Sequence, residues 1–231
     1  MFHPLDHPMK RGWVGRIDGE HVVQLAAQTL QSFFTGGGSA REHAVFPLES
    51  VRLLTPVLYP PAVRVFDHAT SFSFANPAAV MGPDAVIAAR RTPSNSLLQG
   101  DLVLLPRLAA MVGADGAIGG FTAVADWRRP GLARPKDRDF ALALGPALLT
   151  PDELAPDGLQ AVVRVAGGER LTGCFRDFDW EAARALAAEA TTLRPGDLIV
   201  GPPLDAVTDL APGTAVELDV EHIGVLAQTI V

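Results

Sequence analysis

Turn signals recur along most of this chain, and their spacing limits the kind of fold that it can adopt. Beyond residue 56, short apolar runs alternate with turns at Gly82-Pro83, Gly113 to Gly116, Gly167-Gly168, Pro195-Gly196 and Pro212-Gly213. Because glycine and proline interrupt regular elements, short apolar runs between them are typical of strands joined by hairpins. We therefore expect a mainly β protein with some α-helix (α+β).

Three segments give more definite local predictions. Residues 161–173, AVVRVAGGERLTG, alternate apolar side chains around Gly167-Gly168, which predicts a hairpin with both glycines at positive φ. Residues 179–190, DWEAARALAAEA, predict a helix with Asp179 as its N-cap. Residues 215–231 alternate well enough to form two strands bent at Gly224.

The N-terminal quarter differs in pattern from the rest of the chain. Residues 1–8 contain two prolines and no periodic pattern, so we expect a disordered tail there. Residues 9–55 predict a small N-terminal domain, with a hairpin turning at Asp18-Gly19 and a short helix that ends at the glycines 36–38. Residues 56–231 are expected to form the main domain.

Composition excludes several classes of protein. The net charge of −7 argues against nucleic acid as a partner, since binding phosphates needs a basic face. A basic run (Arg128, Arg129, Arg134, Lys136 and Arg138) is interrupted by prolines, and we interpret it as a solvated loop rather than an anion site. No apolar run approaches the roughly 18 residues that span a membrane. With a single cysteine, Cys174, and no signal peptide, we expect a cytoplasmic location.

Five segments in the same order resemble the fumarylacetoacetate hydrolase family. They are FSFANPAAVMGP (72–83), GGFTAVADW (119–127), KDRDFALALGPALLTPDEL (136–154), TLRPGDLI (192–199) and VELDVEHIGVL (216–226). The resemblance implies a mixed β-roll or sandwich with a small N-terminal domain, a homodimer, and a keto acid or diketo acid as the small-molecule substrate. It also implies carbon–carbon hydrolysis, decarboxylation or isomerisation as the reaction.

The same resemblance assigns the family's metal-binding positions, and most of them have changed. The family holds magnesium or manganese with an early acidic residue, a Glu-x-Glu pair and the Asp of Asn-Asp-Trp. These positions align with Val65, with Leu105 and Arg107, and with Asp126. One carboxylate beside a guanidinium makes a poor site for a divalent cation. We therefore predict no metal cofactor, with Asp126 the only retained ligand position.

Arg107 has two interpretations. It could be a fixed cation that binds a substrate carboxylate together with Lys136, which matches a family lysine near the substrate. Alternatively, Arg107 and Asp126 form an ion pair that fills a metal site whose other ligands have been lost, and we favour this interpretation. Asp67 lies two residues after Val65, so on a strand it faces the same pocket and is a further candidate for substrate binding.

The family's catalytic histidine has two possible alignments. Asp67-His68-Ala69 matches an Asp-His-Ala motif of the shorter members, which makes His68 a candidate general base, although Ser71 stands where that motif continues to a glutamate. Against the longer members, the histidine falls on Phe72. The glycine-rich turn that normally ends in a substrate-binding threonine reads Val200-Gly201-Pro202-Pro203, so its hydroxyl is missing.

Three functional hypotheses follow. The first is an enzyme in which the catalytic residues are His68, Arg107 and Lys136, and in which Asp67, Arg107 and Lys136 bind a diketo or β-keto acid. The second is an inactive homologue that serves as a binding or scaffold subunit. The third is a shifted metal site built from Asp67, Asp101 and Asp126.

Overall fold

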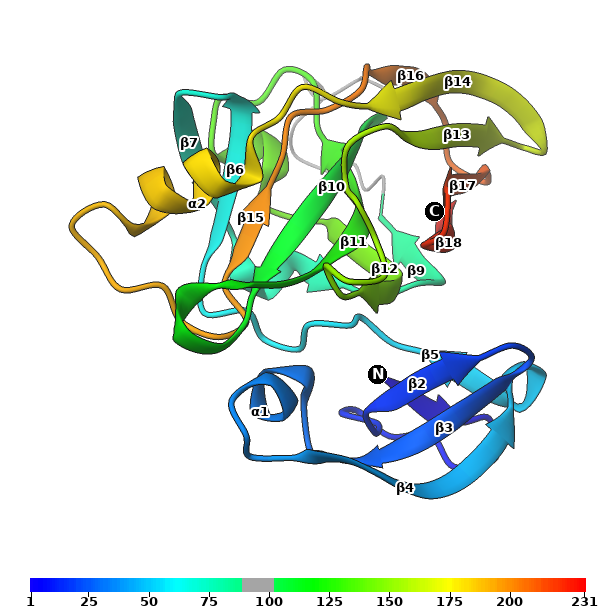
Figure 1. Ribbon diagram of the computed structural model, residues 1–231. Coiled ribbons are helices and arrows are strands. Elements are labelled where there is room, and N and C mark those ends of the chain that lie inside the picture. The colour runs from blue at the N-terminus through cyan, green and yellow to red at the C-terminus, as the bar shows by residue number, and fades with distance from the viewer. Residues whose placement is uncertain (89–101) are drawn as a thin grey trace.

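The computed structural model describes residues 1–88 and 102–231, and its strands form four sheets (Figure 1). Two small sheets come from the first 53 residues. One pairs β1 (Phe2–Pro4) with β5 (Val51–Leu53), and the other has the order β2-β3-β4, with bounds Gly15–Asp18, His21–Ala26 and Ser39–Pro47. The short helix α1 (Leu30–Phe34) lies between β3 and β4 in the chain. The short helix is confirmed, and so is the hairpin of β2 and β3. Its turn lies at Gly19-Glu20, between the paired residues Asp18 and His21, and not at Asp18-Gly19 as expected.

The expected disordered tail over residues 1–8 is wrong at its start. The backbone of Phe2 exchanges hydrogen bonds with Trp13, at 2.9 and 2.7 Å, and β1 pairs with β5. The Phe2 ring is only 1% exposed and packs edge-on against Trp13 and Phe46. Burial of this aromatic side chain offsets the entropy of ordering the chain end, a contribution that the two prolines gave no reason to expect.

The largest sheet has eight strands and carries the candidate site. Its order is β7-β6-β15-β10-β11-β12-β8, with β16 also paired to β10. The bounds are Val63–His68 for β6, Ser71–Ala75 for β7, Val80–Met81 for β8, Leu102–Val112 for β10, Ile118–Arg128 for β11, Leu142–Leu149 for β12, Leu198–Val200 for β15 and Val207–Leu210 for β16. The long hairpin of β10 and β11 runs through its middle (Figure 1). The expected division after residue 55 falls between β5 and β6 and stays a prediction.

A five-stranded sheet packs against the large one. Its order is β14-β13-β17-β18-β9, with bounds Gly168–Phe175, Leu159–Val165, Ala215–Val220, Gly224–Ile230 and Ala85–Ile87. The main hydrophobic core lies between the two sheets, and Trp127 of β11 donates a 2.6 Å hydrogen bond across it to Gln228 of β18. The mainly β, α+β class is therefore confirmed.

Alternation along β10 separates two buried environments. Leu108 and Ala110 face the core between the sheets, whereas Ala109 and Met111 belong to a second core with β6 and β15. Because successive side chains of a strand point to opposite faces, Arg107 shares the second face. The sheet therefore holds an arginine in a largely apolar layer, which requires local partners for its charge.

The local predictions hold with one change. Helix α2 (Trp180–Ala188) begins after Asp179, whose side chain accepts a 2.9 Å hydrogen bond from the Ala182 amide, so the N-cap is confirmed. The hairpin of β13 and β14 turns at Ala166 and Gly167, both at positive φ, and not at Gly167-Gly168 as expected. No helix in the described ranges 1–88 and 102–231 is long and apolar enough to cross a membrane.

Candidate functional site

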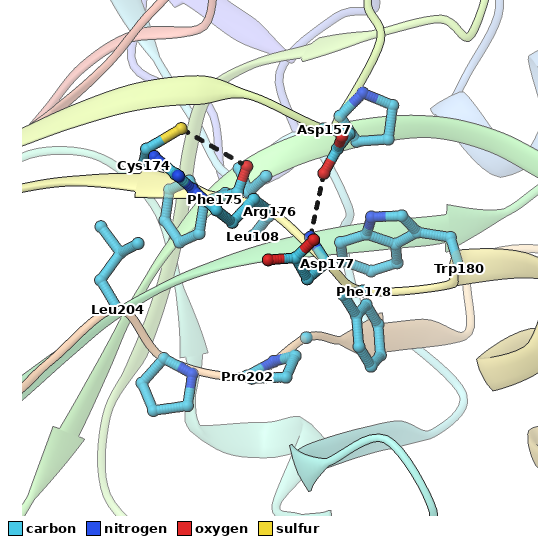
Figure 2. Close-up of a pocket in the computed structure, with 13 residues that line it drawn as sticks. Leu108, Asp157, Cys174, Phe175, Arg176, Asp177, Phe178, Trp180, Pro202 and Leu204 are labelled. Carbon is cyan, nitrogen blue, oxygen red and sulfur yellow. Dashed lines mark hydrogen bonds between the residues drawn. The ribbon is translucent and has the colours of Figure 1, made fainter.

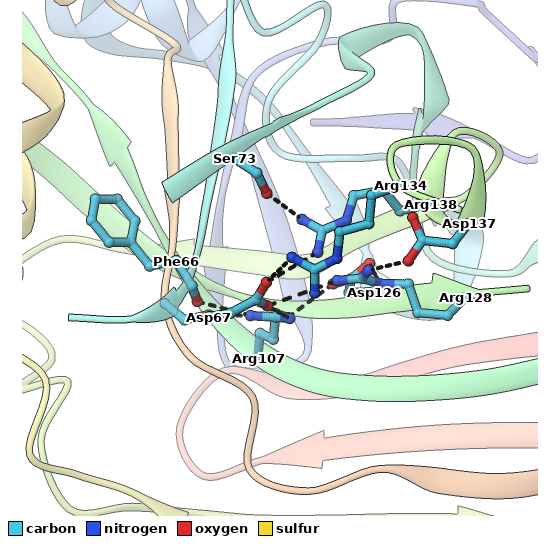
Figure 3. A network of polar contacts seen from close by, with 10 residues as sticks. Phe66, Asp67, Ser73, Arg107, Asp126, Arg128, Arg134, Asp137 and Arg138 are labelled. Atoms are coloured by element: carbon cyan, nitrogen blue, oxygen red, sulfur yellow. Dashed lines mark hydrogen bonds and ion pairs between the residues drawn. The ribbon is translucent and has the colours of Figure 1, made fainter. Parts of the chain in front are cut away.

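Seven charged side chains meet at the edge of the second core, and we call them the arginine–aspartate network (Figure 3). They come from β6, β10, the end of β11, the following loop and the 3-10 helix Lys136–Arg138. The members are Asp67, Arg107, Asp126, Arg128, Arg134, Asp137 and Arg138. Four guanidiniums face three carboxylates, so the network carries one positive charge in excess.

Arg107 lies at the centre of this network and is 0% exposed. Its Nη1 donates to the backbone carbonyls of Phe66, at 3.0 Å, and Gly201, at 2.9 Å. Nη2 donates to Asp67 Oδ1 at 2.6 Å. Nε lies 2.9 Å from Asp126 Oδ2, but the angle of its N–H does not meet hydrogen-bond geometry, so this contact is an ion pair only. Arg107 is thus held on three sides by protein acceptors.

Asp126 is bound by two guanidiniums. Arg128 donates from Nε to Oδ1 at 3.0 Å and from Nη2 to Oδ2 at 2.9 Å, a two-pronged contact that suits the planar carboxylate. Arg107 lies against the same Oδ2, and the Asp126 residue is 1% exposed. Burial alone would lower the pKa of Arg128, but Asp126 and Asp137 raise it above its usual value.

A β-bulge in β6 directs the Asp67 side chain toward the other members of the network. The register of β6 against β7 shifts between Phe66 and His68, which leaves Asp67 without a partner across the sheet. Its carboxylate lies 2.6 Å from Arg107, 2.7 Å from Arg134 and 3.4 Å from Arg138. The expectation that Asp67 and Val65 share a face is met, since the Asp67 side chain points to Arg107 on the same side.

The pKa of Asp67 predicts an acid-sensitive contribution to stability. Burial alone would raise this pKa, but the hydrogen bond and charge of Arg107, the hydrogen bond of Arg134 and the charge of Arg138 hold it well below the ordinary value of 3.8. Because the folded-state pKa lies below the unfolded one, the contribution is complete above about pH 4 and is lost as pH falls through the folded value.

We expect Asp67→Asn to remove part of this acid dependence. The difference in unfolding free energy between wild type and Asp67→Asn should be largest near pH 7 and should shrink steadily below pH 4, as urea titrations at several pH values would measure. The control is Asp18→Asn, at a side chain that is 69% exposed, for which only a small difference in unfolding free energy is expected. A constant difference for Asp67→Asn down to pH 2 would contradict the assignment.

The interpretation of the basic run as a solvated loop is wrong for two of its members. The side chains of Arg128 and Arg138 are only 8% and 2% exposed, because the end of β11 and the 3-10 helix turn them inward onto Asp126, Asp137 and Asp67. Arg134 does reach solvent, at 59% exposure, although it also pairs with Asp67. The sequence contains these residues as a visible run, but nothing in it specifies which of them turn inward.

Lys136 and His68 take peripheral positions. Lys136 is 73% exposed and pairs with Asp139 on the same turn. Over the described residues, none of its polar contacts reaches Asp67, Arg107 or Asp126. His68 lies at the exposed end of β6, one residue from Asp67. The catalytic role expected of both residues and the substrate-binding role expected of Lys136 therefore stay predictions. Arg107 and Asp67, by contrast, are in direct contact with each other.

The donor chemistry of the network does not fit a divalent cation. Val65 and Leu105 offer no oxygen ligand, and Arg107 brings a positive charge. Both Asp126 oxygens already accept from guanidiniums. In the part of the chain that the structure describes, no three His, Cys, Asp or Glu side chains are grouped so as to hold a metal ion. The alternative set with Asp101 falls outside the described residues.

A separate cavity of about 290 Å³ is lined by Leu108 of β10, by residues between 174 and 180, and by the segment 201–204 that follows β15 (Figure 2). Leu108 and Gly201 form part of its wall, and Phe178 and Trp180 close one side with aromatic rings. Sequence reasoning did not identify this cavity, because its walls come from segments far apart in the chain. Cys174 lines it as a partly buried free thiol.

Comparisons with known proteins agree with this architecture. A sequence model described as Fumarylacetoacetate (FAA) hydrolase C-terminal matches residues 67–231. Maleylpyruvate hydrolase from Sphingobium sp. SYK-6, solved with manganese(II) ion and pyruvate, is similar in structure, with a TM-score of 0.78 at 20% identity over 96% of this chain and 97% of that one. No curated protein matches the sequence.

Two further solved structures share the fold. Fumarylacetoacetate hydrolase from psychrophilic Exiguobacterium antarcticum has a TM-score of 0.77 at 18% identity, with 95% of each chain covered. 5-Carboxymethyl-2-hydroxymuconate delta-isomerase from Mycobacterium smegmatis has a TM-score of 0.74 at 19% identity, over 100% of this chain and 97% of that one. At such identities the likeness establishes the fold alone.

Proposed function

Because this chain belongs to the fumarylacetoacetate hydrolase family, we propose that it is a metal-independent, non-catalytic member that serves as a binding or scaffold subunit. In this proposal the arginine–aspartate network takes the place of the family's cation. The positions that the family uses for metal ligands then serve stability. The homodimer expected from the resemblance is part of the same proposal.

The burial and the polar contacts of Arg107 and Asp126 are the observation that supports this proposal. A cation that activates a substrate needs open coordination positions, so that carbonyl oxygens can reach it. Arg107 is instead 0% exposed and donates to two backbone carbonyls and Asp67. Asp126 is covered by Arg107 and Arg128. These contacts are typical of a buried structural ion pair.

The enzyme hypothesis would require a different arrangement. Arg107 and Lys136 would have to bind one diketo or β-keto acid, with His68 activating water. Arg107 has no exposed surface, and Lys136 pairs with Asp139 at 73% exposure. The hydrolase and isomerase names of the similar structures make a keto acid the natural ligand to test, and pyruvate is the ligand named in the maleylpyruvate hydrolase structure.

Metal binding and turnover test the proposal directly. We expect no heat when manganese or magnesium is titrated into the purified full chain, and no change of unfolding temperature with EDTA. The Sphingobium maleylpyruvate hydrolase, solved with manganese(II), is the positive control for binding. We also expect no turnover of acylpyruvates or oxaloacetate. Stoichiometric manganese binding would rule out the metal-independent part of the proposal, and turnover of any of these substrates, with or without EDTA, would rule out the non-catalytic part.

A further inference from the structure

The environment of the Asp67 carboxylate is that of a bound anion. All four guanidiniums of the network surround this one group, with nitrogen to oxygen distances of 2.6 Å for Arg107, 2.7 Å for Arg134, 3.4 Å for Arg138 and 3.9 Å for Arg128. Planar guanidiniums are well suited to recognise a carboxylate. Asp67 therefore occupies a place that could also accept the carboxylate of another molecule.

Arg138 is the least satisfied member of this set. Its side chain is only 2% exposed, yet its closest carboxylate contact among the described residues is 3.4 Å long, and none of those residues provides a hydrogen-bond partner for its Nε. Its other contact is to the Ser73 hydroxyl at 3.1 Å. A buried charge whose closest carboxylate contact is this long is only partly compensated, so this guanidinium favours an additional or better placed anion.

The position of Asp67 allows exchange with solvent. The bulge leaves Asp67 without a partner across the sheet, and an exposed turn, Ala69-Thr70, follows it. The Asp67 side chain is 22% exposed and Arg134, its outer partner, is 59% exposed. A small molecule can thus approach the side of the network where Asp67 lies, whereas Arg107 has no exposed surface while Asp67 contacts it.

We propose that the four guanidiniums form a carboxylate-binding site that the Asp67 side chain occupies in this conformation, and that a small mono- or dicarboxylate takes its place when Asp67 withdraws. The inference rests on the proposed function, because Arg107 must be held by protein contacts at the family's metal position. It adds the class of ligand that the network recognises.

Chemical rescue of Asp67→Ala tests this site. Formate, acetate and oxalate are the probes, and chloride and sulfate at matched ionic strength report general anion effects. We expect formate or acetate to raise the unfolding temperature of Asp67→Ala more than that of wild type. We expect oxalate to bind Asp67→Ala at least about tenfold more tightly than wild type by calorimetry. Asp67→Asn provides a second variant of nearly unchanged shape if Asp67→Ala does not fold.

Two controls test whether carboxylate rescue and oxalate binding arise at the arginine–aspartate network. Asp219→Ala removes a carboxylate from the partly exposed pair with Arg164 and should show no carboxylate-specific rescue. Arg138→Gln combined with Asp67→Ala should lose the gain in oxalate binding. Equal oxalate affinity in wild type and both Asp67 variants, or equal rescue by chloride and sulfate, would overturn the inference. Manganese binding by wild type would instead refute the proposed function, so the two failures are distinguishable.

Discussion

Arg107→Met is expected to lower the free energy of unfolding by about 3–5 kcal/mol, the range for a buried charge pair that loses one partner. The substitution leaves Asp126, which is 1% exposed, with Arg128 as its remaining close cation. It also leaves the carbonyls of Phe66 and Gly201 without their donor. Methionine fills a similar volume, so the loss reports on polar contacts more than on a cavity. Urea unfolding at pH 7 measures the effect.

Two further variants serve as comparisons for Arg107→Met. Arg107→Lys keeps the charge but cannot reproduce the several directed contacts of the guanidinium, so a smaller loss is expected. Arg16→Met removes an arginine that is 49% exposed and pairs with Glu42, and it should cost less than about 1 kcal/mol. If Arg107→Met were as stable as wild type, Arg107 would not be the structural replacement that the proposed function requires.

Trp127→Ala is expected to destabilise the chain by about 3–5 kcal/mol, the usual cost of removing a large aromatic side chain from a core. Trp127 is 0% exposed, packs between the two larger sheets and donates to Gln228 at 2.6 Å. The substitution opens a cavity and leaves the buried Gln228 oxygen without its donor. Equilibrium unfolding, followed by circular dichroism rather than tryptophan fluorescence, gives the measurement.

The hydrogen bond and the packing can be separated. Gln228→Leu retains the indole but removes its acceptor, and should cost about 1–3 kcal/mol. Tyr59→Ala removes an aromatic ring that is 72% exposed and should stay within about 0.5 kcal/mol of wild type. A loss for Trp127→Ala no larger than that for Gln228→Leu would show that packing of the indole contributes little.

Local patterns in the sequence were sufficient to predict most of the fold. Alternating apolar residues and turn signals predicted the β13–β14 hairpin. The predicted turn was one residue too late, because Ala166 takes the positive φ expected of a glycine. Asp179 was correctly identified as the N-cap of α2, since capping depends on neighbours in the chain. The first strand was missed because burial of Phe2 depends on Trp13 and Phe46, which follow later.

The sequence by itself determined the family, the mainly β class and the replacement of acidic residues by Val65, Leu105 and Arg107, because these follow from residue identity and order. Only the tertiary structure decided the environment of each charge. Arg128 and Arg138 belong to one basic run with Arg134, yet two are buried and one is exposed. That difference arises where β6, β10 and β11 meet, because whether a charge is desolvated depends on neighbours that sequence distance does not reveal.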